Sequence, residues 1–281
     1  MTYLTLRNGL QLPQIGLGTW QITDRELMCS VIAESFELGY RLIDTAAAYS
    51  NEIAVAKAVA SCGIPRGELI LSDKVWNTSR GYDAVQEACR RSLKKLKTDY
   101  LDIYLIHWPA SPRLHPDWRE LNAETWRGME QLYKDGLVRT IGVCNFKEHH
   151  LEELKKTAEI MPFIDQFELH PGLPQKELLK YCNENGICVE ASSPLGSGQV
   201  LANNTIAGIA AAYGKTPAQI CLKWVLQNGA AAIPKSTKKA RLAENMDVFD
   251  FSLAPEEMDA ISSMPYCGGI GIDPDEVTEF G

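Results

Sequence analysis

Short apolar runs alternate with longer amphipathic stretches along most of the chain. The short runs predict eight strands, at Ile15–Leu17, Leu42–Asp44, Leu69–Ser72, Ile103–Ile106, Thr140–Val143, Phe163–Phe167, Ile187–Glu190 and Ala231–Ile233. The stretches between them predict helices, including Glu52–Ala60, Ala84–Lys95 and Ala123–Lys134. Before the first strand, two alternating runs between Tyr3 and Leu12 flank Asn8-Gly9, which predicts a β-hairpin.

Eight strands, each followed by a helix in one unbroken series, predict a closed parallel (β/α) barrel of the TIM type. No linker or shift in composition divides the chain, so we expect residues 1–281 to form a single domain. The alternative is a doubly wound sheet. The glycine fingerprint of dinucleotide-binding doubly wound folds is absent, because Gly16-Leu17-Gly18 continues into Thr19-Trp20.

Composition and charge exclude several classes of protein. A net charge of -8 and a pI near 5.3 argue against nucleic acid as a partner, because phosphate binding needs a basic face. The N-terminus does not resemble a signal peptide, and no apolar run has the length of a membrane span. The eight cysteines form no CxxC pair and indicate reduced thiols, so we expect a cytoplasmic protein without a membrane partner.

Polar side chains stand at the ends of five predicted strands: Asp44, Lys74, His107, Asn145 and Gln166. Each of them alone is more often a structural residue than a functional one. However, the carboxyl ends of barrel strands meet at one face, where active sites of such barrels lie. Five polar residues in the same register therefore predict a site at that face.

The residue types suggest acid–base chemistry. Lys74 and Asp44 on neighbouring strands can pair, which would offset the cost of burying each charge, and Tyr49 follows closely enough to lie over them. A neighbouring ammonium lowers the pKa of a phenol from about 10 toward the working range of a general acid. His107 could orient a substrate carbonyl. The alternative is that Asp44 and Lys74 form only a structural salt bridge between two strands.

With these residues in view, the sequence resembles the aldo-keto reductases from about Leu10 to the C-terminus. The motifs are Gly16-Leu17-Gly18-Thr19-Trp20, Ile43-Asp44-Thr45-Ala46-Ala47-Ala48-Tyr49, Lys74-Val75-Trp76, Leu105-Ile106-His107-Trp108-Pro109, Ile141-Gly142-Val143-Cys144-Asn145-Phe146, Gln166-Phe167-Glu168-Leu169-His170-Pro171, Ser193-Pro194-Leu195-Gly196 and Ile233-Pro234-Lys235-Ser236. The chain looks most like the microbial and protozoan subgroup that includes diketogluconate reductases and prostaglandin F synthases.

The resemblance implies NADPH-dependent reduction of aldehydes and ketones. It implies Tyr49 as the general acid, Lys74 and Asp44 as the groups that tune it, and His107 as the group that orients the substrate. The implied cofactor contacts are Thr19, Trp20, Asp44, Asn145, Gln166, Ser193, Leu195, Ser197, Lys235, Ser236, Thr237, Arg241, Glu244 and Asn245. The implied substrate contacts are Trp20, Tyr49, Trp76, His107 and Trp108, with Trp118 expected to approach from the loop after the fourth strand. Lys235 and Arg241 would bind the 2′-phosphate.

Several positions depart from the family pattern. Cys144 stands where a serine is usual, Asp165 where an asparagine is common, and Ser192 where an aromatic residue usually stacks on the nicotinamide. Losing that stacking partner would weaken cofactor binding by about 1 kcal/mol or more. Asp73 is also unusual, and we expect it to face away from the catalytic pair because neighbouring strand residues point to opposite faces.

Other functions are also possible. A non-catalytic cofactor-binding regulatory module would share the fold, and a barrel aldolase or isomerase could use Lys74 as a Schiff-base amine. We expect no metal site, because His149 and His150 should splay to different faces of a helix without an acidic partner at ligand spacing. The expected partner is a small-molecule carbonyl compound, and we expect a monomer.

Overall fold

The computed structural model describes residues 2–277. Its larger sheet has eight parallel strands, in the order β10-β9-β8-β7-β6-β5-β4-β3. The strands are β3 (Leu17–Gly18), β4 (Leu42–Asp44), β5 (Ile70–Val75), β6 (Ile103–Ile106), β7 (Ile141–Cys144), β8 (Ile164–Glu168), β9 (Cys188–Ser192) and β10 (Ala231–Ala232). Each overlaps one of the eight predicted strands. The main difference is at β5, which continues past Ser72 through Lys74.

The two ends of this sheet meet and close it into a barrel. The Gly16 backbone N–H donates to the Ala232 carbonyl at 2.9 Å, and the Ala232 N–H donates to the Gln14 carbonyl at 2.8 Å. Farther along, the Gly18 N–H donates to the Pro234 carbonyl at 3.1 Å. Strand order follows chain order throughout, without the reversal that defines a doubly wound sheet. The predicted barrel is therefore confirmed, and the doubly wound alternative is wrong.

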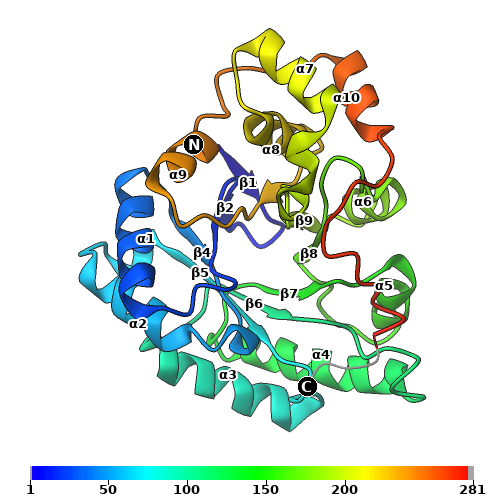
Figure 1. Cartoon of the computed structure of the whole chain (residues 1–281). Helices are drawn as coiled ribbons and strands as arrows, with labels where there is room; N and C mark the ends of the chain where they lie inside the picture. Colours follow the sequence, from blue (N-terminus) through cyan, green and yellow to red (C-terminus); the bar gives the residue numbers. More distant parts are fainter. Residues whose placement is uncertain (1, 278–281) are drawn as a thin grey trace.

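The helices form a ring around the strands (Figure 1). They are α1 (Arg25–Glu37), α2 (Glu52–Ser61), α3 (Tyr82–Leu96), α4 (Trp118–Lys134), α5 (Glu148–Lys155), α6 (Lys176–Glu184), α7 (Asn204–Tyr213), α8 (Pro217–Gln227), α9 (Lys239–Met246) and α10 (Pro255–Ser262). Three short 3-10 helices are η1 (Ala47–Tyr49), η2 (Arg66–Glu68) and η3 (Gly196–Ala202). None of the helices within residues 2–277 combines the length and apolar character needed to cross a membrane.

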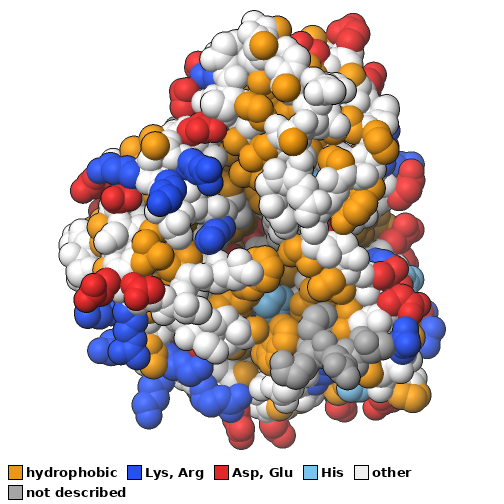
Figure 2. Space-filling model, viewed as in Figure 1, with side chains coloured by type: hydrophobic (Ala, Val, Ile, Leu, Met, Phe, Trp, Pro, Cys, Tyr) orange, Lys and Arg blue, Asp and Glu red, His pale blue; other side chains and the backbone are white. Residues whose placement is uncertain are grey.

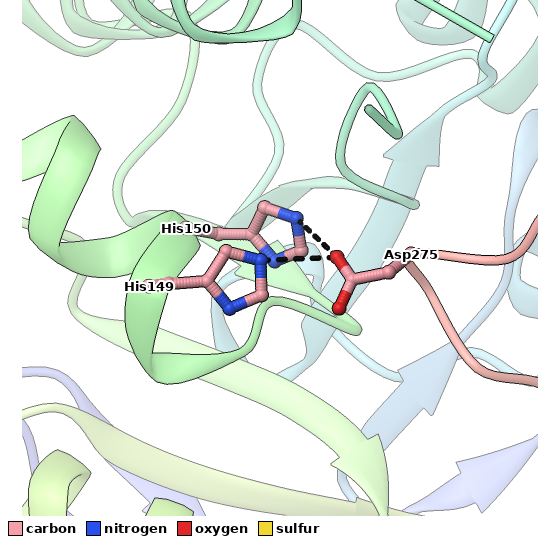
Figure 3. A group of neighbouring side chains, drawn as sticks. All are labelled: His149, His150 and Asp275. Atoms are coloured by element: carbon pink, nitrogen blue, oxygen red, sulfur yellow. Dashed lines mark hydrogen bonds and ion pairs between the residues drawn. The ribbon is translucent and has the colours of Figure 1, made fainter. Parts of the chain in front are cut away.

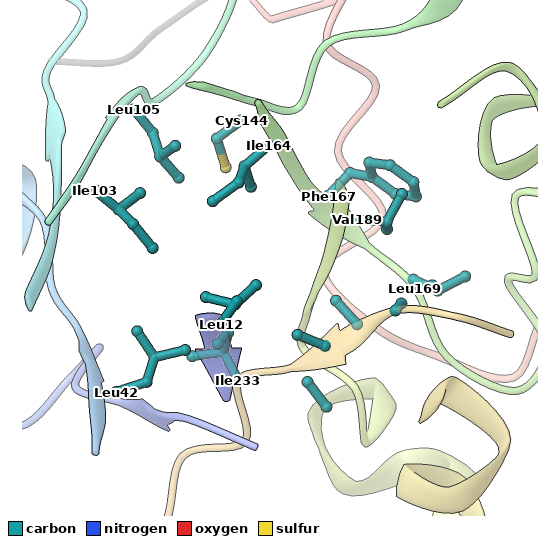
Figure 4. Packing of buried hydrophobic residues seen from close by; sticks show 14 of the residues in the cluster. Leu12, Leu42, Ile103, Leu105, Cys144, Ile164, Phe167, Leu169, Val189 and Ile233 are labelled. Carbon is teal, nitrogen blue, oxygen red and sulfur yellow. The ribbon is translucent and has the colours of Figure 1, made fainter. Parts of the chain in front are cut away.

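The predicted hairpin is confirmed as β1 (Tyr3–Thr5) and β2 (Gln11–Pro13), an antiparallel pair in which Leu4 opposes Leu12. Its turn needs a residue in the left-handed region, and Gly9 supplies it with a φ of 88°. Leu12 on β2 is fully buried and lies among side chains from the barrel strands (Figure 4).

The interior of the barrel changes character along its axis. Side chains of Leu42, Ile103, Leu105, Ile164 and Ile233 pack together in the apolar part, as expected for a filled barrel (Figure 4). One step nearer the carboxyl ends of the strands, the buried residues become polar, with Asp44, Ser72, Lys74, Gln166 and Glu190. The chain therefore places its costly buried polar groups together, at the face where the strands end.

Candidate active site

The four predicted catalytic side chains lie together at the carboxyl ends of β4, β5 and β6. Lys74 Nζ donates to Asp44 Oδ2 at 2.6 Å and to the Thr45 carbonyl at 3.0 Å. The ring of Tyr49, in η1, has its centroid 5.3 Å from Lys74 Nζ and 5.7 Å from the His107 ring. The geometric part of the sequence prediction is met, since one lysine, one carboxylate, one phenol and one imidazole share a single site.

A buried hydrogen-bond network holds the segment between Asp44 and Tyr49. The Asn51 side chain donates to the Thr19 carbonyl at 2.9 Å and accepts from the Thr45 hydroxyl at 2.7 Å. The Thr19 hydroxyl donates to the Asp44 carbonyl at 2.9 Å. These bonds fix the turn that carries Tyr49 onto the Asp44–Lys74 pair. They also engage Thr19, which is fully buried. Neither Thr19 nor Thr237, both predicted cofactor contacts, lines the cavity.

The pKa of Tyr49 differs from the sequence expectation. Burial raises the pKa of this phenol above its ordinary value, and the Lys74 charge lowers it only in part. The expectation of a lowered pKa is therefore wrong for the structure as it stands, because burial outweighs the ammonium. The phenol consequently stays protonated at neutral pH, as a proton donor must.

His107 is electrically neutral at the same pH. Burial, and then the Lys74 charge, hold its pKa well below the usual range. Its ring contacts the rings of Tyr49 and Trp76 edge-on, at 5.7 and 5.1 Å between centroids. A neutral imidazole held in this way keeps one N–H donor and one acceptor nitrogen.

Gln166 connects the pair to a further buried acid that sequence reasoning missed. Gln166 Nε2 donates to Asp44 Oδ1 at 3.1 Å and to Glu190 Oε2 at 3.0 Å. Gln166 on β8 and Glu190 on β9 are register partners, so both side chains point into the barrel. The available signal was an acidic residue inside an otherwise apolar strand. It was overlooked because its partners come from other strands.

A cavity of 1420 Å³ opens above this network. Figure 2 shows a hollow in the same face, bordered largely by hydrophobic side chains, with Lys and Arg side chains gathered over α9 beside it. The predicted site residues that line the cavity are Trp20, Asp44, Tyr49, Trp76, His107, Trp108, Asn145, Gln166, Ser193, Leu195, Ser197, Lys235, Ser236, Arg241, Glu244 and Asn245. Lys74 lies just beneath the wall, with no exposed surface.

The cavity wall also concentrates unusual backbone conformations. Gln21, Asn145, Gln175, Ser193 and Ser197 all have a positive φ, between 45° and 63°, although none is glycine. Such residues cost free energy and tend to collect where a binding site needs a fixed shape. At Gly18 the backbone passes close to the Ile233 carbonyl oxygen: a Cβ at this position would lie 3.1 Å from that oxygen, so glycine fits best there.

The two ends of the cavity carry different charges. At one end, Lys235 and Arg241 form no ion pair with any described residue, whereas the neighbouring Lys239 pairs with Glu37 at 2.6 Å. Unpaired cations beside the Ser236 hydroxyl suit a phosphate group. At the other end lie Asp44, Tyr49 and His107. The cavity therefore fits an elongated ligand with an anionic end, which agrees with a dinucleotide.

Cys144, which stands where the family usually has a serine, contacts both Asn145 and Gln166. Asn145 Nδ2 donates to the His107 carbonyl at 2.9 Å and approaches Cys144 Sγ at 3.2 Å. Cys144 Sγ lies 3.8 Å from Gln166 Oε1, and burial raises the pKa of the thiol well above its usual value. Cys144 is therefore a protonated, weak donor where a serine hydroxyl was expected. Ser192 lies in the same wall.

Asp73 and Asp165 are buried acids that face the other way, toward the surrounding helices. Asp73 has Glu52 and Ser92 as neighbours, while Lys74 Nζ binds Asp44, so the expected orientation is confirmed. Burial raises the pKa of Asp73 to about 7, and burial likewise raises the pKa of Asp165 well above its usual value. A protonated Asp165 has the shape of the asparagine that is common at this position.

Replacing Asp165 with asparagine is expected to raise the free energy of unfolding by about 1 kcal/mol or more at alkaline pH. The folded-state pKa is raised, so wild type loses stability as pH rises above the unfolded value of about 3.9, and asparagine does not titrate. Urea unfolding at about pH 4 and about pH 8 measures the gain. The exposed Asp99→Asn serves as the control. A gain that is the same at both pH values would contradict the account.

His149 and His150 correct one expectation. Their ring centroids lie 4.0 Å apart, and both Nε2 atoms approach Asp275 Oδ1, at 3.0 and 3.2 Å (Figure 3). They do not splay apart, and an acidic partner arrives from the C-terminal segment. Trp118 packs edge-on against the same two rings instead of approaching the cavity.

This histidine cluster has a hydrogen-bonding pattern of its own. His150 Nδ1 accepts the backbone N–H of Lys147 at 3.1 Å, and burial, with the charge of His149, lowers the pKa of His150 to about 3. The neutral ring then carries its hydrogen on Nε2, which lies 3.2 Å from Asp275 Oδ1 without forming a hydrogen bond and offers no lone pair to a metal. Lys147 Nζ also binds Asp275 Oδ2, at 2.8 Å. The cluster thus fastens the C-terminal segment to α5.

Comparison with known proteins identifies relatives along nearly the whole chain. The model of the Aldo/keto reductase family matches residues 14–265. Glyoxal reductase from Bacillus subtilis is 45% identical over 97% of this chain and 96% of its own length. Methylglyoxal reductase DkgA from Escherichia coli is 42% identical over 98% of both chains. The crystal structure of a Gox0644 variant in complex with NADPH is similar with a TM-score of 0.90, at 39% identity over 99% of both chains.

Proposed function

The chain belongs to the aldo/keto reductase family, and we propose that it reduces aldehydes and ketones to alcohols with NADPH. The observation that carries this proposal is the buried Asp44–Lys74 pair beneath Tyr49 at one end of a cavity. At the other end are Lys235 and Arg241, two cations without an ion-pair partner among residues 2–277. A screen of aldehydes, ketones and quinones with purified protein and NADPH tests it.

The cavity suits the cofactor along its length. Lys235, Ser236 and Arg241 would hold the 2′-phosphate, and Asn145 and Gln166 would bind the carboxamide of the nicotinamide. Gln166 has both amide hydrogens engaged by Asp44 and Glu190, so it would accept from the carboxamide through Oε1. When bound, NADPH supplies the hydride, and the protein supplies position and charge.

Tyr49 is the proposed proton donor to the carbonyl oxygen. Its phenol is protonated at neutral pH, and its loss of a proton is assisted by the Lys74 ammonium, which lies 5.3 Å from the ring centroid. Asp44 holds that ammonium in place at 2.6 Å. His107, neutral and bordered by Tyr49 and Trp76, would donate a hydrogen bond that orients the substrate carbonyl.

A Schiff-base role for Lys74 fits the structure poorly. Burial alone would lower the pKa of Lys74, but the Asp44 carboxylate raises it above its usual value, so the amine stays protonated and is not nucleophilic. Its Nζ is also fully buried and already donates to Asp44 and Thr45. Borohydride trapping with a carbonyl substrate checks this, and a covalent adduct on Lys74 would favour the aldolase or isomerase alternative.

The substrate end of the cavity is mainly apolar. Trp20, Trp76 and Trp108 line it together with Ile270 and Ile272 from the C-terminal segment. Aromatic walls with a few polar groups suit small carbonyl compounds. Because two similar proteins bear the names glyoxal reductase and methylglyoxal reductase, we propose α-dicarbonyl compounds as the first substrates to try.

Replacing Arg241 with alanine is expected to raise the dissociation constant of NADPH by about 10-fold or more and to leave that of NADH nearly unchanged. The substitution would remove a charge-assisted contact between the guanidinium and the 2′-phosphate, worth about 1.5–3 kcal/mol, and NADH lacks that phosphate. Fluorescence titration with both nucleotides measures the two constants. Lys239→Ala is the matched control, because Lys239 is on the same helix but pairs with Glu37. Equal affinity of wild type for NADPH and NADH would contradict the assignment.

A further inference from the structure

Glu190 is a buried acid that the proposed chemistry does not use. It lies in the middle of β9, has no exposed surface, and points into the barrel beside Gln166. Such positions are normally filled by apolar branched residues. A carboxylate there costs free energy unless its surroundings compensate for it. Its presence therefore calls for an explanation from its contacts.

The contacts of Glu190 control the orientation of one amide. Glu190 Oε2 accepts a hydrogen bond from Gln166 Nε2 at 3.0 Å, and the other hydrogen of that NH₂ group goes to Asp44 Oδ1 at 3.1 Å. Neither carboxylate can donate when ionised, so the amide cannot be reversed without losing both bonds. Gln166 Oε1 is left to face Cys144 and the cavity.

Within residues 2–277, no cation is available as a counter-ion for Glu190 alone. The titratable groups that face it are Asp44, Lys74, Cys144 and Cys188. Asp44 and Lys74 neutralise each other, and both thiols stay protonated because burial raises their pKa values, to about 12 for Cys188. Glu190 Oε1 has no hydrogen-bond partner within the described part of the chain. Burial, and then the Asp44 charge, raise the pKa of Glu190 to about 7.

A positively charged ligand group near Gln166 would supply the missing counter-charge. The two oxidation states of the cofactor differ in this respect, because the nicotinamide ring is neutral in NADPH and positive in NADP⁺. Gln166, one of the two amides proposed to bind the carboxamide, lines the cavity, whereas Glu190 does not line it and is hydrogen-bonded to Gln166. The charge of Glu190 would therefore act on the ring from just behind Gln166, in a buried region of low dielectric.

We propose that Glu190 is a positioning residue with two effects: it fixes Gln166 as a hydrogen-bond acceptor for the nicotinamide carboxamide, and its carboxylate favours the oxidised, cationic ring over the reduced, neutral one. This inference rests on the proposed function, since it requires NADPH and NADP⁺ to bind in the cavity. Stabilising the charge that develops on the ring would also favour hydride donation.

The test compares the dissociation constants of NADPH and NADP⁺ by fluorescence titration at about pH 5.5 and about pH 8.5, on either side of the titration of Glu190. The ratio of the two constants is the quantity of interest, because the adenine and phosphate groups are common to both nucleotides and cancel. In wild type, binding of NADP⁺ relative to NADPH should strengthen by about 10-fold between the lower and the higher pH.

Two variants separate the two effects. Glu190→Gln keeps an acceptor for Gln166 but has no charge, so its ratio should stay at the low-pH value of wild type at both pH values. Glu190→Leu also removes the acceptor, and should in addition weaken both nucleotides by about 10-fold. Asp73→Asn is the matched control. The pKa of Asp73 is also raised to about 7, but Asp73 faces the helices, so the ratio of the two dissociation constants in this variant should follow wild type.

Each outcome decides one claim. A wild-type ratio that does not change with pH, or a Glu190→Gln ratio that changes as wild type does, would overturn the role of Glu190 while leaving the proposed function intact. If the ratio of the two dissociation constants no longer changed with pH in Asp73→Asn, the pH dependence would come from Asp73, and the role of Glu190 would be overturned as well. If wild type binds neither nucleotide, the proposed function fails, and this inference fails with it. A Glu190→Leu variant that binds both nucleotides as tightly as wild type would overturn the role of Glu190 in fixing Gln166. If Glu190→Leu does not fold, the smaller Glu190→Ala tests that role in its place, while Glu190→Gln decides the charge effect.

Discussion

Replacing Tyr49 with phenylalanine is expected to lower kcat for carbonyl reduction by about 10²–10⁴-fold. The substitution removes one hydroxyl and with it the only proposed proton donor to the carbonyl oxygen. The ring itself, which lies between Lys74 and His107, remains to fill the space, so the fold and the cofactor cavity should be unchanged. The dissociation constant of NADPH should therefore stay within about twofold of wild type.

The measurement for Tyr49→Phe is steady-state consumption of NADPH, together with fluorescence titration of the nucleotide. Tyr266→Phe is the matched control, because Tyr266 also lines the cavity but belongs to the C-terminal segment and is 55% exposed. It should retain kcat. If Tyr49→Phe also retained kcat, the proton would have to come from another group, and the assignment of Tyr49 would be wrong.

Replacing Lys74 with methionine is expected to affect stability and turnover together. The substitution leaves the buried Asp44 carboxylate without its partner at 2.6 Å, which typically costs about 3–5 kcal/mol of unfolding free energy. It also removes the cation that would stabilise the Tyr49 phenolate, so kcat should fall by about 100-fold or more. Urea unfolding and steady-state kinetics measure the two effects separately.

The double variant Asp44→Asn with Lys74→Met separates these effects from each other. Removing both charges should restore most of the lost stability, since no unpaired charge remains, but turnover should stay low. Lys95→Met is the matched control, because Lys95 pairs with the buried Glu52 at 2.5 Å on the outer side of the barrel wall. It should reduce stability and leave kcat unchanged. Turnover restored in the double variant would reduce Asp44–Lys74 to a structural salt bridge.

Much of the fold could be predicted because its signals are local. Each barrel strand is a short apolar run, and hydrophobic periodicity identified all eight. The boundaries were less accurate where a polar residue is buried. The polar residues after Ser72 suggested that the third strand ends there, but β5 runs through Asp73 and Lys74 to Val75. Lys74 can remain in the strand because Asp44, on the neighbouring strand, balances its charge.

The parts of the site that escaped prediction depend on non-local contacts. Glu190 acquires its importance from Gln166 and Asp44, which lie on other strands. Neighbouring helix residues point about 100° apart, so His149 and His150 were expected to diverge. The C-terminal Asp275 instead contacts both rings. Sequence spacing contains no information about an acidic partner that arrives from so far along the chain.

The pKa of Tyr49 illustrates a third limit. The sequence correctly identified Lys74 as a group that lowers this pKa, but it gave no measure of how deeply the phenol is buried. In the structure, burial is the larger effect. The sign of a shift produced by two opposing causes depends on distances and burial, which only the folded chain provides.

The most direct test of the central claim follows NADPH consumed and alcohol formed in the same reaction of the purified wild-type protein with methylglyoxal and a panel of simple aldehydes. The account predicts that at least one substrate is reduced, with one alcohol formed for each NADPH oxidised, and that Tyr49→Phe abolishes most of this turnover. Tight binding of NADPH without its oxidation by any carbonyl in the panel would contradict the account and favour a non-catalytic cofactor-binding module.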